Sequence, residues 1–192
     1  MPSTRRSVLR AATGLSSLTV AGCQSFSGDS EPTEKPQTDP VTDYTVVTLR
    51  RADGAPYRYT GNRRSGESLV VGSSDDIDAL SFPTDGSKAD EFGSFVRETD
   101  FEERSVLLYR RRVSECDRQH VESVWRRPGS LSVTLCRERR AADVDCSTDT
   151  EVEVGIAIRV PFTSDQFDQP TASTSSECTD RFGPRDTTTE GA

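Results

Sequence analysis

Apolar and polar side chains alternate strictly in the second half of the chain. The apolar members of the two clearest runs are Leu131, Val133 and Leu135, followed by Val152, Val154, Ile156, Ile158 and Val160. A period of two residues puts these side chains on one face of an extended strand. Such patterning is typical of antiparallel strands with one buried face. We therefore predict a mostly β fold of the α+β class, built on a small antiparallel sheet or sandwich.

Further strands and two short helices complete this prediction. Strands are expected at 44–51, 67–72, 105–113, 120–126, 131–137 and 152–160, with 57–60 pairing back on the first of them as a hairpin. Ser73 and Ser74 precede several acidic residues, which predicts an N-cap at one of these serines and a short helix over 75–80. Helical spacing of apolar residues predicts a second helix over 89–99. The last four strands are expected to form a meander.

The N-terminus resembles an export signal. Arg5 and Arg6 stand ahead of the weakly apolar segment 11–21, and an aliphatic residue with two small residues then leads to Cys23. This order resembles a Tat signal ending in a lipobox, where the precursor is cut and Cys23 is lipidated. Segment 11–21 would span only about half of a ~30 Å hydrocarbon core as a helix. We therefore expect the Tat translocase to export the protein and a lipid to anchor it to the extracytoplasmic face of the cell membrane.

The chain divides into four predicted parts. They are a signal peptide at 1–22, the lipidated cysteine with a disordered stalk at 23–43, a β-rich globular domain at 44–165, and a flexible tail at 166–192 that Cys178 ties down. The stalk is polar and interrupted by prolines, so it buries too little apolar surface to offset the entropy lost on ordering.

Four cysteines remain besides the one at the lipobox. They are Cys116, Cys136, Cys146 and Cys178. An even number of cysteines in an exported chain predicts two disulfides, and no two of them stand at the close spacing of a zinc site. A meander would gather three of them at one end of the sheet. This favours Cys116–Cys146 with Cys136–Cys178, and a Cys116–Cys136 bridge is nearly as easily reached.

Acidic residues dominate the composition. The formal net charge is −8, and lysine occurs only at Lys35 and Lys88 among 24 basic residues. An acidic surface that favours arginine over lysine resembles the proteomes of haloarchaea. An acidic bacterial lipoprotein is the alternative source.

One segment departs from this acidity, because arginines concentrate between residues 104 and 140. The candidates for an anion-binding patch are Arg110, Arg111, Arg112, Arg126, Arg127, Arg137, Arg139 and Arg140. Gathered on one surface, they would bind lipid headgroups, a surface glycan or an acidic partner. The alternative is that acidic residues of the same domain pair with them.

The sequence carries no recognisable catalytic constellation. His120 is the single histidine and is expected at an exposed or edge position, so a nucleophile would lack its usual base. We predict no cofactor, no metal site and no nucleic-acid partner. The expected function is a non-catalytic binding or interaction module at the cell surface, with an envelope protein or an anionic surface ligand as partner. A small carboxylate-dependent hydrolase acting on surface polymers is the alternative.

The layout of residues 65–162 resembles the C-terminal domain of the protease-complex accessory subunit PrcB. The shared order is a strand, a short helix, Asp100 and Phe101 leading into the strand at 105, a hairpin, and a final strand ending near Pro161. The Gly-Tyr element of that family's hairpin is replaced here by 120–124. Similar layouts occur in Tat lipoproteins of haloarchaea, and the resemblance implies a role assisting a membrane partner.

Overall fold

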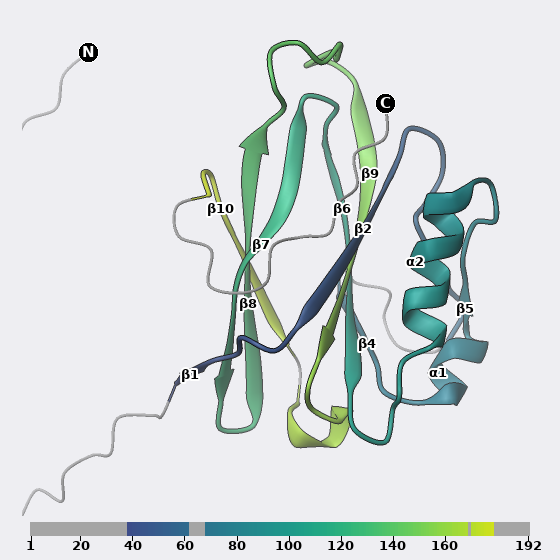
Figure 1. The fold of residues 1–192 in the computed structure, drawn as a ribbon, viewed down its shortest axis with the longest axis vertical. Helices are drawn as coiled ribbons and strands as arrows, with labels where there is room; N and C mark the ends of the chain where they lie inside the picture. Colours follow the sequence, from purple (N-terminus) through teal and green to yellow (C-terminus); the bar gives the residue numbers. More distant parts are fainter. Residues whose placement is uncertain (1–37, 62–67, 169, 179–192) are drawn as a thin grey trace, which may run out of the picture. The chain divides into compact units, whose positions relative to one another are not determined.

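The computed structural model describes residues 38–61, 68–168 and 170–178 (Figure 1). Arg5, Arg6 and Cys23, on which the export and lipidation predictions rest, lie outside these ranges. The described residues confirm a mostly β fold with antiparallel sheets, two short helices and two disulfides.

Two four-stranded sheets lie face to face. The first sheet has the order β1-β7-β8-β10 and contains β1 (Asp39–Pro40), β7 (Asp117–Arg127), β8 (Ser130–Arg139) and β10 (Thr171–Ser175). The second has the order β2-β9-β6-β4 and contains β2 (Thr45–Arg51), β9 (Glu151–Val160), β6 (Ser105–Ser114) and β4 (Ser68–Val71). All pairings are antiparallel except the one between β10 and β8.

Helices form a third layer, on the outer side of the second sheet (Figure 1). This layer contains α1 (Ser74–Asp78), α2 (Ser87–Arg97) and a small sheet of β3 (Arg58–Tyr59) with β5 (Leu80–Ser81). The side chain of Ser73 caps α1 by accepting a hydrogen bond from the backbone of Asp76, as predicted. A 3₁₀ turn, Ser164–Gln166, follows β9.

The second sheet is buried on both faces, because one face meets the first sheet and the other meets the helices. Leu107 and Tyr109 of β6 belong to the core between the sheets, whereas Val106 and Leu108 pack in the core beneath α2. This explains the unbroken buried run at the start of β6. Gly155 of β9 allows the helix layer to approach closely, since a Cβ there would lie 2.6 Å from the Cβ of Pro56.

Two predicted pairings are wrong. The four C-terminal strands do not form a meander, because the chain crosses from one sheet to the other between β6 and β7. Segment 57–60 does not pair with the first long strand. All seven residues of β2 instead pair with β9, which offers a longer alternating strand, and β3 pairs with β5 in the helix layer.

The structure also differs from the predicted boundaries at both ends of the domain. The predicted stalk contains β1, which pairs with Trp125 and Arg126 of β7, and Val41 behind it is buried. The predicted tail contains β10, and Phe167 before it packs into the core between the sheets. Backbone pairing and apolar burial therefore extend the domain beyond 44–165 in both directions.

Candidate functional site

The space between the two sheets changes from apolar to polar along its length. On the inner face of β8, Leu131, Val133 and Leu135 are fully buried. Arg137 and Arg139 continue the same stripe, since alternate residues of a strand share a face, and both are exposed. The sandwich is therefore closed by apolar side chains at one end of β8 and opens into polar ones at the other.

Polar residues also enter the inward stripes of β7 and β6, whereas the inward residues of β9 stay apolar up to Val152. On β7, buried Val121 is followed towards the strand's beginning by Gln119 and Asp117, and on β6, buried Tyr109 is followed by Arg111. We call this polar region the open end and define it by Arg111, Asp117, Gln119, Arg137 and Arg139. The closed end is the opposite one, where the β7–β8 turn meets the 3₁₀ turn (Figure 1).

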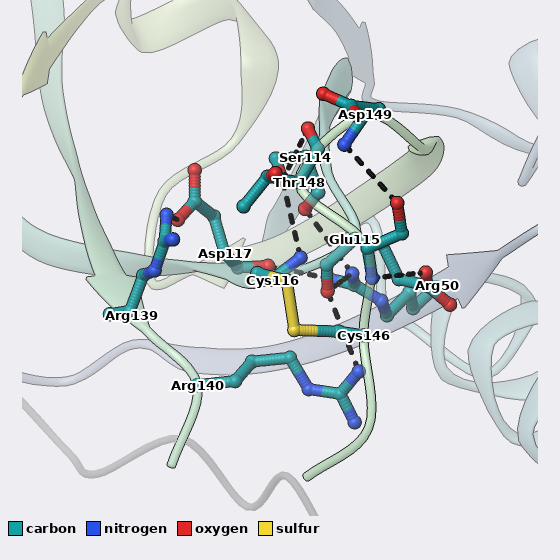
Figure 2. The surroundings of a disulfide bond; sticks show 11 residues. Arg50, Ser114, Glu115, Cys116, Asp117, Arg139, Arg140, Cys146, Thr148 and Asp149 are labelled. Carbon is teal, nitrogen blue, oxygen red and sulfur yellow. Dashed lines mark hydrogen bonds and ion pairs between the residues drawn. A yellow bond between two sulfur atoms is a disulfide. The ribbon is translucent and has the colours of Figure 1, made fainter. Parts of the chain in front are cut away.

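Arginine side chains fasten the β6–β7 turn at the open end (Figure 2). The guanidinium of Arg50 donates hydrogen bonds to the carbonyl oxygens of Asp117 at 2.6 Å, Ser114 at 3.3 Å and Glu115. Arg140 donates a further hydrogen bond to the Glu115 carbonyl at 3.4 Å. Burial, and then the charge of Arg140, lower the pKa of Arg50. The guanidinium thus supplies donors to three carbonyl oxygens of the turn, in addition to the backbone hydrogen bonds that join the turn to Thr150 and Arg140.

The Cys116–Cys146 disulfide reinforces this turn. It joins the turn to the long β8–β9 loop with a Cα–Cα distance of 5.2 Å (Figure 2). The Glu115 carboxylate accepts a hydrogen bond from the backbone of Ser147 at 2.9 Å, which holds the same loop. The predicted pairing is confirmed, although the strands on either side of the turn belong to different sheets.

The Cys136–Cys178 disulfide, also predicted, fixes the segment after β10 against β8. Its Cα–Cα distance is 5.0 Å. β10 runs parallel to β8 from the Thr171–Ser132 pair to the Ser175–Cys136 pair, so the bridge closes the end of this ladder. Residues 174–176 are thereby held beside the open end.

A cleft of about 660 Å³ lies at the open end. Arg111, Asp117, Gln119 and Arg137 line it from the sheets, and residues 174–176 line it from the end of β10. A second cleft, of about 530 Å³, shares Asp117, Arg137 and Ser176 with the first and continues past the Cys136–Cys178 bridge. The two form one groove, and each part has a volume in the usual range for small-ligand sites.

Arginines and carboxylates both line this groove: Glu138, Glu151 and Glu177 belong to its lining, but Asp117 is the carboxylate that faces the inward arginines. The carboxylate of Asp117, only 8% exposed, lies 3.6 Å from the guanidinium of Arg137 and 3.5 Å from that of Arg139. The guanidinium of Arg111 donates to the hydroxyl of Thr174 across the cleft. One carboxylate thus faces two arginines, and each guanidinium has five donors. Arg137 and Arg139 are 52% and 66% exposed, so donors remain for a ligand.

Gln119 is a buried polar residue of the cleft. It is 6% exposed, and its Oε1 has no hydrogen-bond partner among the described residues. An unpaired buried acceptor costs free energy that a ligand donor would recover. The last torsion of a glutamine side chain is broad and roughly two-fold, so the amide can turn this oxygen towards the cleft.

The eight arginines of the predicted patch do not lie together. Arg111, Arg137 and Arg139 lie on the inner face of the open end, and Arg140 binds the β6–β7 turn. Arg126 and Arg127 lie at the closed end, about 30 Å away along β7 by the rise of a strand.

The remaining two arginines of the prediction lie on the outer face of β6. Arg112 is 3.1 Å from the Glu153 carboxylate and 3.9 Å from that of Glu151. Arg110 is 3.9 Å from Glu153 and lies over the ring of Tyr57. Acidic residues of the same domain therefore pair with several of the arginines, which was the alternative expectation.

His120 is buried rather than exposed. Its Nε2 lies 2.9 Å from a carboxylate oxygen of Glu138 on the adjacent strand. It stands next to Gln119 on the strand and therefore on the opposite face, away from the inner face of the open end.

Sequence reasoning missed Arg50, Asp117 and Gln119. A signal was present in the strand pattern. Arg50 follows buried Val46 on the same face four residues on, and Gln119 and Asp117 precede buried Val121 at successive spacings of two residues. Polar residues at inward positions mark the point where a sandwich opens. The predicted strand 120–126 began too late to include the last two.

Comparison with known proteins found no match among family models, curated proteins or solved structures. Across residues 38–61, 68–168 and 170–178, no helix has the length and apolarity needed to cross a membrane. In the same ranges, no three His, Cys, Asp or Glu side chains are grouped as metal ligands would be.

Proposed function

We propose that this chain is an exported, lipid-anchored binding module that holds an anionic ligand of the cell envelope in the cleft at its open end. The observation that carries the proposal is the inner face of the groove, where Arg137 and Arg139 both face the inward carboxylate of Asp117. Glu138, Glu151 and Glu177 line the groove as well. Two disulfides are typical of a protein that works in an oxidising compartment. The lipobox-like Cys23 supplies the proposed attachment.

The rigidity of the site supports binding. Two disulfides and the Arg50 hydrogen bonds fix the turn and the β10 segment that border the cleft. A pre-ordered site loses less entropy when a ligand binds, so more of the contact energy appears as affinity. Such a module is compatible with a haloarchaeal source and with a bacterial one. It is also compatible with a role as accessory subunit of a membrane partner.

A hydrolase remains the alternative proposal. Asp117 and Glu151 both line the cleft and would be the pair of carboxylates to consider. Asp117 faces two guanidinium groups, and Glu151 lies 3.9 Å from Arg112. Both carboxylates are thus engaged by arginine side chains of the same domain. We therefore favour binding over hydrolysis.

Binding is tested by calorimetric titration of the mature domain with two anionic probes, triglutamate and trigalacturonate. Arg137→Gln should weaken at least one of them by about tenfold, because it removes a charged donor. Arg127→Gln is the matched control: the same residue type on the same hairpin, exposed at the closed end. The cleft is not the site if neither probe binds, or if both variants bind as the wild type does.

Anchoring is tested separately in cells of the source organism. Cys23→Ser should abolish lipid labelling and release the protein from the membrane fraction, because the described residues contain no membrane-spanning helix to retain it. Replacement of Arg5 and Arg6 by lysine should block export. Unchanged labelling and membrane retention in the Cys23 variant would remove the lipid anchor from the proposal.

A further inference from the structure

The cleft combines charged and neutral hydrogen-bonding groups in one place. Arg111 and Arg137 supply guanidinium donors, Thr174 and Ser176 supply hydroxyls, and Gln119 supplies a buried amide. A ligand recognised by charge alone, such as a simple anion, would leave the amide of Gln119 without a partner. The composition of the cleft therefore indicates a ligand that carries neutral polar groups as well as negative charge.

We propose that the ligand is an acidic saccharide, with carboxylates bound by the arginines and ring hydroxyls bound by Gln119 and the β10 segment. This inference rests on the proposed function and names the class of its ligand. A hydroxyl both donates and accepts, so it can pair with either atom of the Gln119 amide and with the hydroxyls of 174–176. A carboxylate matches the planar fork of a guanidinium.

The shape of the groove agrees with a chain-like ligand. The second cleft shares Asp117, Arg137 and Ser176 with the first and extends the site beyond it. Arg139 lines this extension together with Glu138 and Glu177, so both parts of the groove contain guanidinium groups and the second part contains carboxylates beside them. Successive acidic rings of one saccharide would each reach an arginine, whereas a single small anion would use only part of the groove.

The test compares three probes: trigalacturonate, which has charge and hydroxyls; galactotriose, which has hydroxyls alone; and triglutamate, which has charge alone. We expect trigalacturonate to bind more tightly than either of the others in low salt. It should also keep more of its affinity in molar salt, where the Debye length falls to about 3 Å and contacts outweigh long-range attraction.

The decisive variant is Gln119→Leu. It should weaken trigalacturonate about three- to tenfold, the worth of one or two hydrogen bonds, and leave triglutamate unchanged. Because it removes an unpaired buried acceptor, it should also raise the midpoint of thermal unfolding. A residue that only supported the fold would show a lower midpoint instead. If Gln119→Leu does not fold, Ser176→Ala tests the hydroxyl contacts instead, because Ser176 is exposed. It should weaken the binding of trigalacturonate and leave that of triglutamate unchanged.

The outcomes separate this inference from the proposal beneath it. In one outcome, triglutamate and trigalacturonate bind with equal affinity, and Gln119→Leu and Ser176→Ala both leave the ratio of these affinities unchanged. That result would overturn the saccharide as ligand and leave a site for anions in general. If no charged probe binds at the cleft, the proposed function fails as well.

Discussion

The two ends of the β7–β8 hairpin use arginine in different ways. At the closed end, Arg126 lies 4.3 Å over the ring of Phe162 and donates to Gln166 at 3.1 Å, so it packs on an apolar surface. At the open end, Arg137 and Arg139 share the carboxylate of Asp117 and remain more than half exposed. One residue type thus closes the core at one end and leaves donors available at the other. Whether an arginine packs on the core or presents exposed donors therefore depends on its position along the strand, not on the number of arginines nearby.

The ends also differ in what stabilises them. At the closed end, Phe167 is buried in the core and the backbone of Asp168 donates to the Gly129 carbonyl at 2.8 Å. At the open end the apolar side chains of β7 and β8 stop, although Val152 of β9 stays buried, and the Cys116–Cys146 bridge and the Arg50 guanidinium hold the turn. At the border of the cleft, a disulfide and the hydrogen bonds of a guanidinium therefore hold the β6–β7 turn, whereas apolar burial holds the β7–β8 turn at the closed end.

The largest effect is expected from removing the Cys116–Cys146 bridge. Its sequence separation is 30 residues, for which the chain-entropy model gives about 3–4 kcal/mol of stability. We expect the Cys116→Ser, Cys146→Ser double variant to lose about this much free energy of unfolding in urea. Hydrogen exchange should rise first around the β6–β7 turn. Equal acceleration at the Gly129 turn would show that the two ends do not differ.

A slightly smaller effect is expected at Arg50. Arg50→Met leaves the carbonyls of Ser114, Glu115 and Asp117 without their donor and should cost about 3 kcal/mol, within the range for charged hydrogen bonds. Arg51→Met is the matched control, because this neighbour pairs with the exposed Asp85. Its loss should be far smaller. Similar losses in the two variants would contradict a clamp specific to the open end.

Alkaline pH tests the burial of Tyr57 in the core beneath α2. Burial raises the pKa of Tyr57 from 10.0 to about 12. The folded-state value lies above the unfolded one, so this contribution is complete below pH 10 and is lost as pH rises towards 12. We expect it to reach about 2–3 kcal/mol. Tyr57→Phe should flatten the pH dependence of unfolding in this window, and an unchanged slope would contradict the assignment.

The smallest effect is expected at the closed end. Arg126→Gln removes a cation–π contact of an exposed type and should cost about 0.5–1 kcal/mol. Trigalacturonate affinity should not change, because the position lies far from the cleft. A loss of binding as large as that in Arg137→Gln would move the binding site to the closed end.

Local pattern was sufficient to predict the long strands, the two helices and the presence of two disulfides, but not β1, β5 or β10. Alternation along 131–137 and 152–160, the Ser73 cap and the even cysteine count each specify a local or pairwise feature. The division into two sheets could not be predicted in this way. β7 could pair with β6 in one sheet or pass into the other sheet, and the choice depends on which faces of β6 distant elements bury. Here α2 buries the outer face of the second sheet and forms a second core there.

The site was predicted less completely than the fold. The density of arginines predicted a patch within residues 104–140. Because successive residues of a strand lie on opposite faces, however, Arg110 and Arg112 lie on one face of β6 and Arg111 on the other. The same parity, extended inward from Val121, would have identified Gln119 and Asp117. Their proximity to residues 174–176 depends on a parallel strand and a disulfide far along the chain, which no local pattern indicates.

The most direct test is a chemical-shift titration of isotope-labelled mature domain with trigalacturonate. Binding at the open end predicts that the perturbed backbone amides cluster at Arg111, Gln119, Arg137 and 174–176, with Arg126 and Gly129 unchanged. Perturbations confined to the Arg126 end, or scattered evenly over the exposed arginines, would contradict a binding site built where the sandwich opens.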